Sequence, residues 1–160
     1  MYALLRRMVV PSIQRELLLN APQDRVWAFL TTPRFYPIWM EDVVSVQAIS
    51  TAVIGPGTTF VLARRRRHAQ ESWIVADWEP PRRLRLAEYR LVTSLIFVLE
   101  PQAEGTRLWL EHSVPPSRGL LGRLMPPVRL QRTVEHMLAR LAELFTFNQD
   151  IKLLYGMGDE

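Results

Sequence analysis

The stretch that decides the fold is residues 126–154, PPVRLQRTVEHMLARLAELFTFNQDIKLL. Its apolar residues recur at steps of three and four, which places them on one side of a helix, while most of the charged residues fall on the other side. About 25 residues at about 1.5 Å each form a rod of roughly 38 Å, too amphipathic to be stable alone. We therefore expect this helix to pack on a broad apolar surface supplied by the rest of the chain.

That surface is predicted over residues 43–114, which read as successive β-strands. At a rise of about 3.3 Å per residue, each strand is about 25 Å long. The links between them are short and contain turn residues such as Gly55-Pro56-Gly57, so an antiparallel meander is favoured over parallel crossovers. We expect the strands at residues 42–50, 58–67, 71–79, 84–89, 94–100 and 106–114.

The N-terminal part adds one strand and two short helices. Residues 13–19 are expected to form a strand, and residues 23–31 a helix that Pro33 ends. Residues 34–40 are dense in aromatic side chains and are expected to form a second short helix. Because the helices cluster at the two ends of the chain, the predicted fold is α+β: a curved antiparallel β-sheet wrapped around a long C-terminal α-helix.

The length of 160 residues and a hydrophobic content of 48% favour a single domain with one core. We expect this domain over residues 13–154, with an extension at 1–12 and a tail at 155–160. The opening residues lack the continuous apolar core of an export signal, and no apolar run reaches the roughly 18 residues of a membrane span. A cytoplasmic location and no stable membrane insertion are expected.

Composition disfavours several classes of function. The formal charge is +4, but Lys152 is the only lysine among the 20 basic residues, a bias that we attribute to genome composition. The run of arginines at 64–67 divides between the two faces of a strand, so no nucleic-acid partner is expected. Cysteine is absent, and His68, His112 and His136 lack metal-ligand spacing, so we expect no metal and no cofactor.

Five stretches of the chain are LLLNAPQDRVWAFLTTPRFYPIWM, GPGTTF, VADWEPPRRLRL, GTRLWLEHSV and GLLGRLM. Together they carry a resemblance to a known family. The chain resembles the START-like or SRPBCC superfamily, close to its polyketide cyclase/dehydrase branch. The resemblance implies the helix-grip fold and a cavity between the concave face of the sheet and the long helix. It says little about function, because members of the superfamily bind lipids, bind hormones or cyclise polyketides.

Strand alternation nominates three polar side chains for the cavity. Glu88 shares a face with Leu84 and Leu86, and His112 shares a face with Leu108 and Leu110, so both are expected to point inward. In the hairpin before them, Arg65 falls on the same side as the more apolar set, and an ion pair between Arg65 and Glu88 is expected. That set is Val61, Ala63, Ile74, Ala76 and Trp78.

These residues leave two functions open. The first is binding or carriage of a small hydrophobic molecule such as a lipid, polyketide or isoprenoid-like compound. The second is a cyclase or dehydratase in which Glu88, His112 and Arg65 move protons. An interaction module with a vestigial cavity is a further alternative. The chain could also form a homodimer. Residues 115–127 either pack on the sheet edge or gate the cavity. The expected ligand-binding residues are Trp27, Phe35, Trp39, Arg65, Trp78, Glu88, Phe97, His112, Met137 and Leu141.

Overall fold

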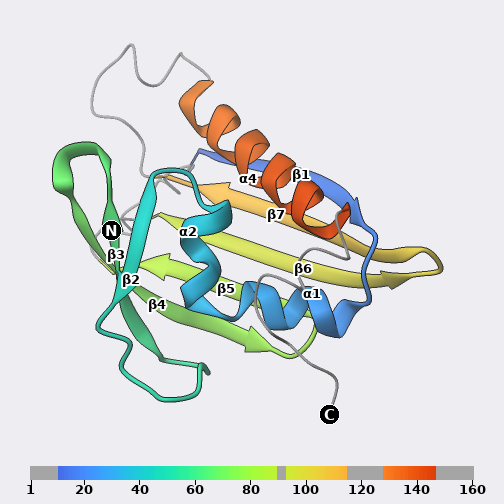
Figure 1. Ribbon diagram of the computed structural model, residues 1–160, viewed down its shortest axis with the longest axis horizontal. Helices are drawn as coiled ribbons and strands as arrows, with labels where there is room; N and C mark the ends of the chain where they lie inside the picture. The colour runs from blue at the N-terminus through green and yellow to red at the C-terminus, as the bar shows by residue number, and fades with distance from the viewer. Residues whose placement is uncertain (1–10, 90–92, 115–127, 147–160) are drawn as a thin grey trace, which may run out of the picture.

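The computed structural model describes residues 11–89, 93–114 and 128–146, which form one antiparallel sheet with helices on one of its faces (Figure 1). The sheet has seven strands in the order β1-β7-β6-β5-β4-β3-β2. The predicted α+β helix-grip fold is therefore confirmed. The strands are β1 (Ser12–Leu19), β2 (Val43–Gln47), β3 (Thr59–Arg64), β4 (Gln70–Glu79), β5 (Arg83–Glu88), β6 (Ser94–Gln102) and β7 (Gly105–Ser113).

Three short helical segments connect β1 to β2. They are α1 (Gln23–Leu30), the 3-10 turn η1 (Pro33–Phe35) and α2 (Tyr36–Trp39), which agrees with the two short helices predicted there. A further 3-10 turn, η2 (Arg66–His68), follows β3. The helix α1 packs against β6 and β7, whereas α2 packs against β2 and the C-terminal helix. Together they close part of the concave face of the sheet.

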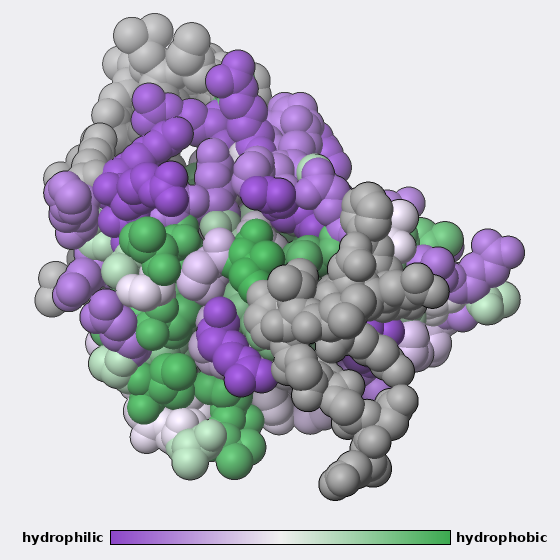
Figure 2. All heavy atoms as spheres, viewed as in Figure 1, coloured by the Kyte–Doolittle hydropathy of each residue, from purple (hydrophilic) through white to green (hydrophobic). Residues whose placement is uncertain are grey.

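The C-terminal helix α4 (Val128–Thr146) runs along β1 and β7 (Figure 1). Its buried residues recur every three or four positions, as the sequence predicts, and its arginines and glutamates are largely exposed. Figure 2 shows the resulting hydrophilic surface over α4. The rest of the predicted helix, and the predicted gate at residues 115–127, lie outside the described residues. The buried residues of α4 are Leu130, Val134, Met137, Leu141 and Phe145.

Strands β6 and β7 supply much of the apolar concave face of the sheet. On β6 and β7, alternate residues are almost completely buried on the concave face and their neighbours are more exposed. Burial of each such side chain stabilises the fold by about 1.5–3 kcal/mol. The residues are Leu95, Phe97, Leu99, Leu108 and Leu110.

A β-bulge in β4 changes which residues face the core. The register against β5 shifts between Val75 and Asp77, so Trp73 and Val75 face inward before the bulge and Trp78 faces inward after it. Two tryptophans five residues apart thus lie on the same face. The prediction that Ile74 and Ala76 share the inner face with Trp78 is wrong, because it assumed uninterrupted alternation.

Candidate functional site

The register of the β3–β4 hairpin decides which arginine faces the interior. Phe60 and Leu62 are buried on the concave face, and Arg64, two residues further, lies on the same face and is half-buried. Arg65 follows the end of β3 in a helical conformation and is exposed. The prediction that Arg65 points inward is therefore wrong. Both faces of β3 carry apolar residues, so alternation alone does not identify the inner face of this strand.

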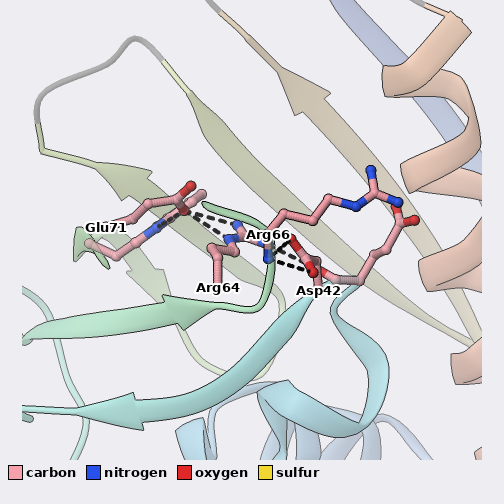
Figure 3. Close-up of polar contacts among 6 residues, drawn as sticks. Asp42, Arg64, Arg66 and Glu71 are labelled. Atoms are coloured by element: carbon pink, nitrogen blue, oxygen red, sulfur yellow. Dashed lines mark hydrogen bonds and ion pairs between the residues drawn. The ribbon is translucent and has the colours of Figure 1, made fainter. Parts of the chain in front are cut away.

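Arg64 forms an ion pair on the concave face with Glu71 of β4 (Figure 3). Its Nη2 and Nε donate hydrogen bonds to Glu71 Oε2 at 3.0 and 3.1 Å, and Trp73 Nε1 donates to the same oxygen at 3.1 Å. The two charged side chains are only 22% and 30% exposed. Among the described residues, this pair takes the place of the predicted pair between Arg65 and Glu88.

A junction at Glu41 and Asp42 ties this ion pair to the helices. Arg64 Nη1 donates to the Glu41 carbonyl oxygen at 2.8 Å, and Thr133 Oγ1 of α4 donates to Glu41 Oε2 at 3.0 Å. The Asp42 carboxylate accepts the backbone N–H of Arg66 at 3.0 and 3.1 Å (Figure 3). Asp42 has a positive φ of 65°, a conformation that Asp tolerates better than most residues. The guanidinium of Arg64 is thus held in place from two sides.

Glu88 and His112 lie on the same concave face, as the sequence predicts. Glu88 is 8% exposed and pairs in register with Trp73, which donates to Glu71. His112 pairs with Leu95, and Leu95 pairs with Leu86, two residues before Glu88. At one end of the antiparallel sheet, strands β3, β5 and β7 finish and strands β4 and β6 start. These polar residues all lie at that end of the sheet. We call this set the polar end; it comprises Arg64, Glu71, Glu88 and His112.

His112 is electrically neutral at physiological pH. Burial disfavours the charged imidazolium and, together with the positive charge of Arg64, lowers the pKa of His112 to about 4, while Glu71 opposes the shift. A neutral imidazole carries one donor and one acceptor nitrogen. The uncharged side chain of His112 can therefore form hydrogen bonds with a polar group or accept a proton.

Two buried polar atoms on the concave side have no hydrogen-bond partner among the described residues. They are Nδ1 of His112 and Nε1 of Trp39, the latter on a side chain that is 1% exposed. Trp39 packs edge-on against Phe97, with ring centroids 5.7 Å apart, and Phe97 pairs with Leu110, two residues before His112 on the same face. Buried polar atoms are normally paired, so these two require an explanation.

Most of the predicted apolar ligand-binding residues belong to the packed core. Met137 and Leu141 of α4 are 2% and 0% exposed, and Phe35 stacks on Phe29. Four pockets lined by described residues open on the outside of the molecule, so a cavity between the sheet and α4 stays a prediction. The core members of the predicted set are Phe35, Trp39, Phe97, Met137 and Leu141.

Trp27 and Trp78 lie apart from that set. Their rings meet edge to face at 5.0 Å and line an open pocket of about 560 Å³ between η1 and the loop after β2. Val53 of this loop is 81% exposed. The loop lies at the lower left of Figure 1, where Figure 2 shows hydrophobic surface. The structure thus separates these two tryptophans from the polar end.

Three residues of this site were not predicted from the sequence: Arg64, Glu71 and Trp73. All three lie in the β3–β4 hairpin, where the assignment of faces failed. Glu71 and Trp73 are two residues apart on a strand, so a carboxylate and an indole N–H on one face could be inferred from spacing. The face that Glu71 and Trp73 occupy depends on their pairing with Leu62 and Glu88, respectively. The local sequence does not encode this register.

The described residues contain no group of three or more His, Cys, Asp or Glu side chains placed to hold a metal ion. Nor does any described helix have the length and apolar character of a membrane span.

Replacing Arg64 with glutamine is expected to raise the pKa of His112 from about 4, because a positive charge that disfavours the imidazolium is removed. The value should stay below 6.5, since burial is the larger cause of the shift. The pKa is measured from the imidazole chemical shifts in an NMR titration. Arg66→Gln is the matched control, because Arg66 is exposed in the 3-10 turn η2. An equal shift of the His112 pKa in both variants would contradict the placement of Arg64 beside His112.

A comparison with protein-family models gives a match over residues 11–146 to the family described as polyketide cyclase / dehydrase and lipid transport. The chain belongs to this family. The resemblance to the SRPBCC superfamily inferred from the sequence is thereby confirmed. The match includes every described strand and helix, and the polar end lies within the family domain. A comparison with curated proteins gave no significant match.

Solved structures of the same architecture are similar at low sequence identity. The protein TTHA0849 from Thermus thermophilus has a TM-score of 0.67 at 20% identity, covering 87% of this chain and 99% of that one. The Aha1 dimer from Colwellia psychrerythraea has a TM-score of 0.61 at 16% identity, with coverage of 86% and 98%. DynU16, a putative protein in the dynemicin biosynthetic locus, has a TM-score of 0.62 at 20% identity, with coverage of 86% and 48%. At these identities the similarity establishes the fold.

Proposed function

We propose that the protein binds a small, largely apolar molecule between the concave face of the sheet and α4, with the polar end holding the polar group of the ligand. The observation that carries this proposal is the pair of buried, unpartnered atoms, Trp39 Nε1 and His112 Nδ1, on the concave side of the sheet. Small-molecule sites combine an apolar lining with a few convergent polar groups. Membership of the polyketide cyclase / dehydrase and lipid transport family supports the same chemistry.

The polar end supports recognition better than structural stabilisation. A partly buried ion pair such as Arg64–Glu71 contributes little net stability, because desolvation offsets much of the Coulombic gain. Arg64 and Glu71 are nonetheless held by four hydrogen bonds that also involve Trp73 and Glu41. Such a rigid, preorganised arrangement is what a site needs to orient a bound molecule.

Acid–base catalysis on the bound molecule is the second candidate function. The specific observation that favours it is a neutral, largely buried His112 on the same concave face as the buried carboxyl side chain of Glu88. A neutral imidazole has an unprotonated nitrogen that can accept a proton from a bound molecule. This corresponds to the cyclase or dehydratase alternative, with Arg64 in the place that was predicted for Arg65.

Addition of N-phenyl-1-naphthylamine, an uncharged apolar probe, is expected to shift the indole N–H signal of Trp39 in a two-dimensional ¹H–¹⁵N NMR spectrum. Trp109 of β7 is the internal control, because it is 38% exposed on the convex face. The variants Trp39→Phe and Trp109→Phe assign the two signals. Saturable binding that leaves the Trp39 signal in place, or moves only Trp109, would refute the proposed location.

Native mass spectrometry of the protein from its own host separates the two candidate functions. A retained small molecule that is recovered unchanged after prolonged incubation supports binding and carriage. Conversion of that molecule by the wild type, together with unchanged retention but no conversion by His112→Gln, supports catalysis. Absence of both a retained molecule and a response to the probe would reject the site.

A further inference from the structure

The convex face of the sheet, opposite the helices in Figure 1, is not covered by any helix of the described residues. The strand register places side chains of this face in two adjacent rows that run across β5, β6 and β7. In each row an aliphatic residue of β6 lies between an arginine of β5 and a residue of β7. The first row is Arg85, Ile96 and Glu111, and the second is Arg83, Val98 and Trp109.

The middle of this face has the composition of a protein–protein interface. Trp109 is 38% exposed, and Ile96 and Val98 are half-buried. These three residues line an open pocket of about 300 Å³ together with Glu111. Tryptophan and arginine are enriched among the residues that contribute most of the energy at such interfaces. The combination of an apolar centre with flanking arginines therefore indicates a protein partner.

The charged residues on the two flanks of β6 are incompletely paired within one chain. Arg85 is half-buried, forms no ion pair within the described part of the chain, and has a buried Nε without a hydrogen-bond partner. Arg83 also has an unpartnered Nε, and its Nη2 reaches Asp77 only at 3.4 Å. Glu111 accepts a hydrogen bond from Gln14 at 3.0 Å. Because Arg85 and Glu111 lie two strands apart, roughly 10 Å, they do not meet in the same chain.

This face is complementary to a second copy of itself. A two-fold axis that is parallel to β6 and lies between two stacked sheets exchanges the β5 flank with the β7 flank. It places Arg85 of each copy opposite Glu111 of the other, and Arg83 opposite Trp109, so that two ion pairs and two cation–π contacts can form. The aliphatic residues of β6 pack against their own copies along the axis. Stacked sheets lie about 10 Å apart, a gap that arginine and glutamate side chains from the two copies can span.

The remaining charges near the axis are compatible with this arrangement. Glu100, the next residue of β6 on this face, would approach its own copy, but it pairs in register with Arg107, which supplies a compensating charge. At the β4 edge, Asp77 forms an ion pair with Arg83. The like-charge contact at Glu100 is therefore offset in each copy.

We infer that two copies of this chain form a symmetric dimer through the convex faces of their sheets, with Arg85 of each copy paired to Glu111 of the other. Ile96, Val98 and Trp109 form the apolar centre of the interface. A phospholipid surface or a nucleic acid matches this face less well, because its phosphates would be repelled by the carboxylate of Glu111. The concave face stays free in this dimer, so the inference is independent of the proposed function.

Analytical ultracentrifugation of the wild type and of two charge-reversal variants, Arg85→Glu and Glu111→Arg, tests the inference. The wild type is expected to reach the mass of two chains as its concentration is raised. Each variant should self-associate at least about a hundredfold more weakly, because both ion pairs become like-charge contacts. An equimolar mixture of the two variants should dimerise within about tenfold of the wild-type affinity, since the mixed dimer again contains two pairs of opposite charge.

Arg129→Glu is the matched control, because Arg129 is exposed on α4, and this variant should dimerise like the wild type. Circular dichroism checks the folding of each variant. Trp109→Ala, which should weaken self-association by at least about tenfold, replaces a charge reversal that does not fold. A wild type that stays monomeric up to roughly 1 mM, equal self-association of the wild type and both charge-reversal variants, or a monomeric mixture would each overturn the inference. These outcomes leave the proposed ligand site on the concave face standing.

Discussion

Replacing Gly105 with alanine is expected to lower the free energy of unfolding by about 3 kcal/mol or more. Gly105 has φ of 139°, a conformation that side chains disfavour, and an added Cβ would collide with the carbonyl oxygen of Leu19. That carbonyl has little room to move, because Leu19 pairs with Thr106 and the Thr106 hydroxyl donates to Ala21 O at 2.7 Å. The β6–β7 turn and the β1–α1 corner should therefore separate in this variant.

Urea denaturation followed by circular dichroism measures this effect. Gly55→Ala is the matched control, since no heavy atom lies within 4 Å of its added Cβ and Gly55 is not among the residues with positive φ. We expect the control to change stability by less than about 1 kcal/mol. Similar losses in the two variants would mean that the contact between Gly105 and Leu19 is not a constraint on the fold.

Acidification from pH 7 to pH 4 is expected to remove about 3 kcal/mol of stability through His112 alone. The folded-state pKa of His112 is about 4, below the ordinary value of 6.5. As pH falls below 6.5, the unfolded chain binds a proton that the folded chain does not, so the unfolded state is favoured. The loss begins near pH 6.5 and is complete below pH 4, where both states are protonated.

The difference between wild type and His112→Gln isolates this contribution from that of the carboxylates. Stability is measured by urea denaturation at pH 7, 6, 5 and 4, and the variant should lose about 3 kcal/mol less than the wild type across this range. His136→Gln is the control, because His136 is exposed on α4, and it should follow the wild type. Parallel curves for wild type and His112→Gln would show that His112 is protonated equally in both states.

The order and type of the elements could be predicted because each has a local signal. The predicted steps of three and four positions are found in α4, where the buried residues are Leu130, Val134, Met137, Leu141 and Phe145. Alternation also placed Glu88 and His112 on the concave face, because β5 and β7 are regular strands with one clearly apolar side. Where the strand is regular and its two faces differ, sequence and structure agree.

The site could be predicted only in part, because it depends on pairing between strands. In β3 both faces carry apolar residues, and in β4 a bulge after Val75 reverses the alternation. Arg65 was therefore chosen instead of Arg64, and Glu71 was not assigned to the cavity. Trp27 and Trp78 were assigned to the same set as Trp39, although they contact each other at a separate pocket. Neither error is visible in the spacing of residues along the chain.

The sequence by itself determined that a long amphipathic helix packs on an antiparallel sheet, because the periods of 3.6 and 2 are properties of short segments. Only the tertiary structure decided which polar groups converge on the concave face. Convergence of Arg64, Glu71, Glu88 and His112 requires the register of five strands, and register is fixed by contacts between residues distant in the sequence. The chemistry of the proposed ligand follows from that register.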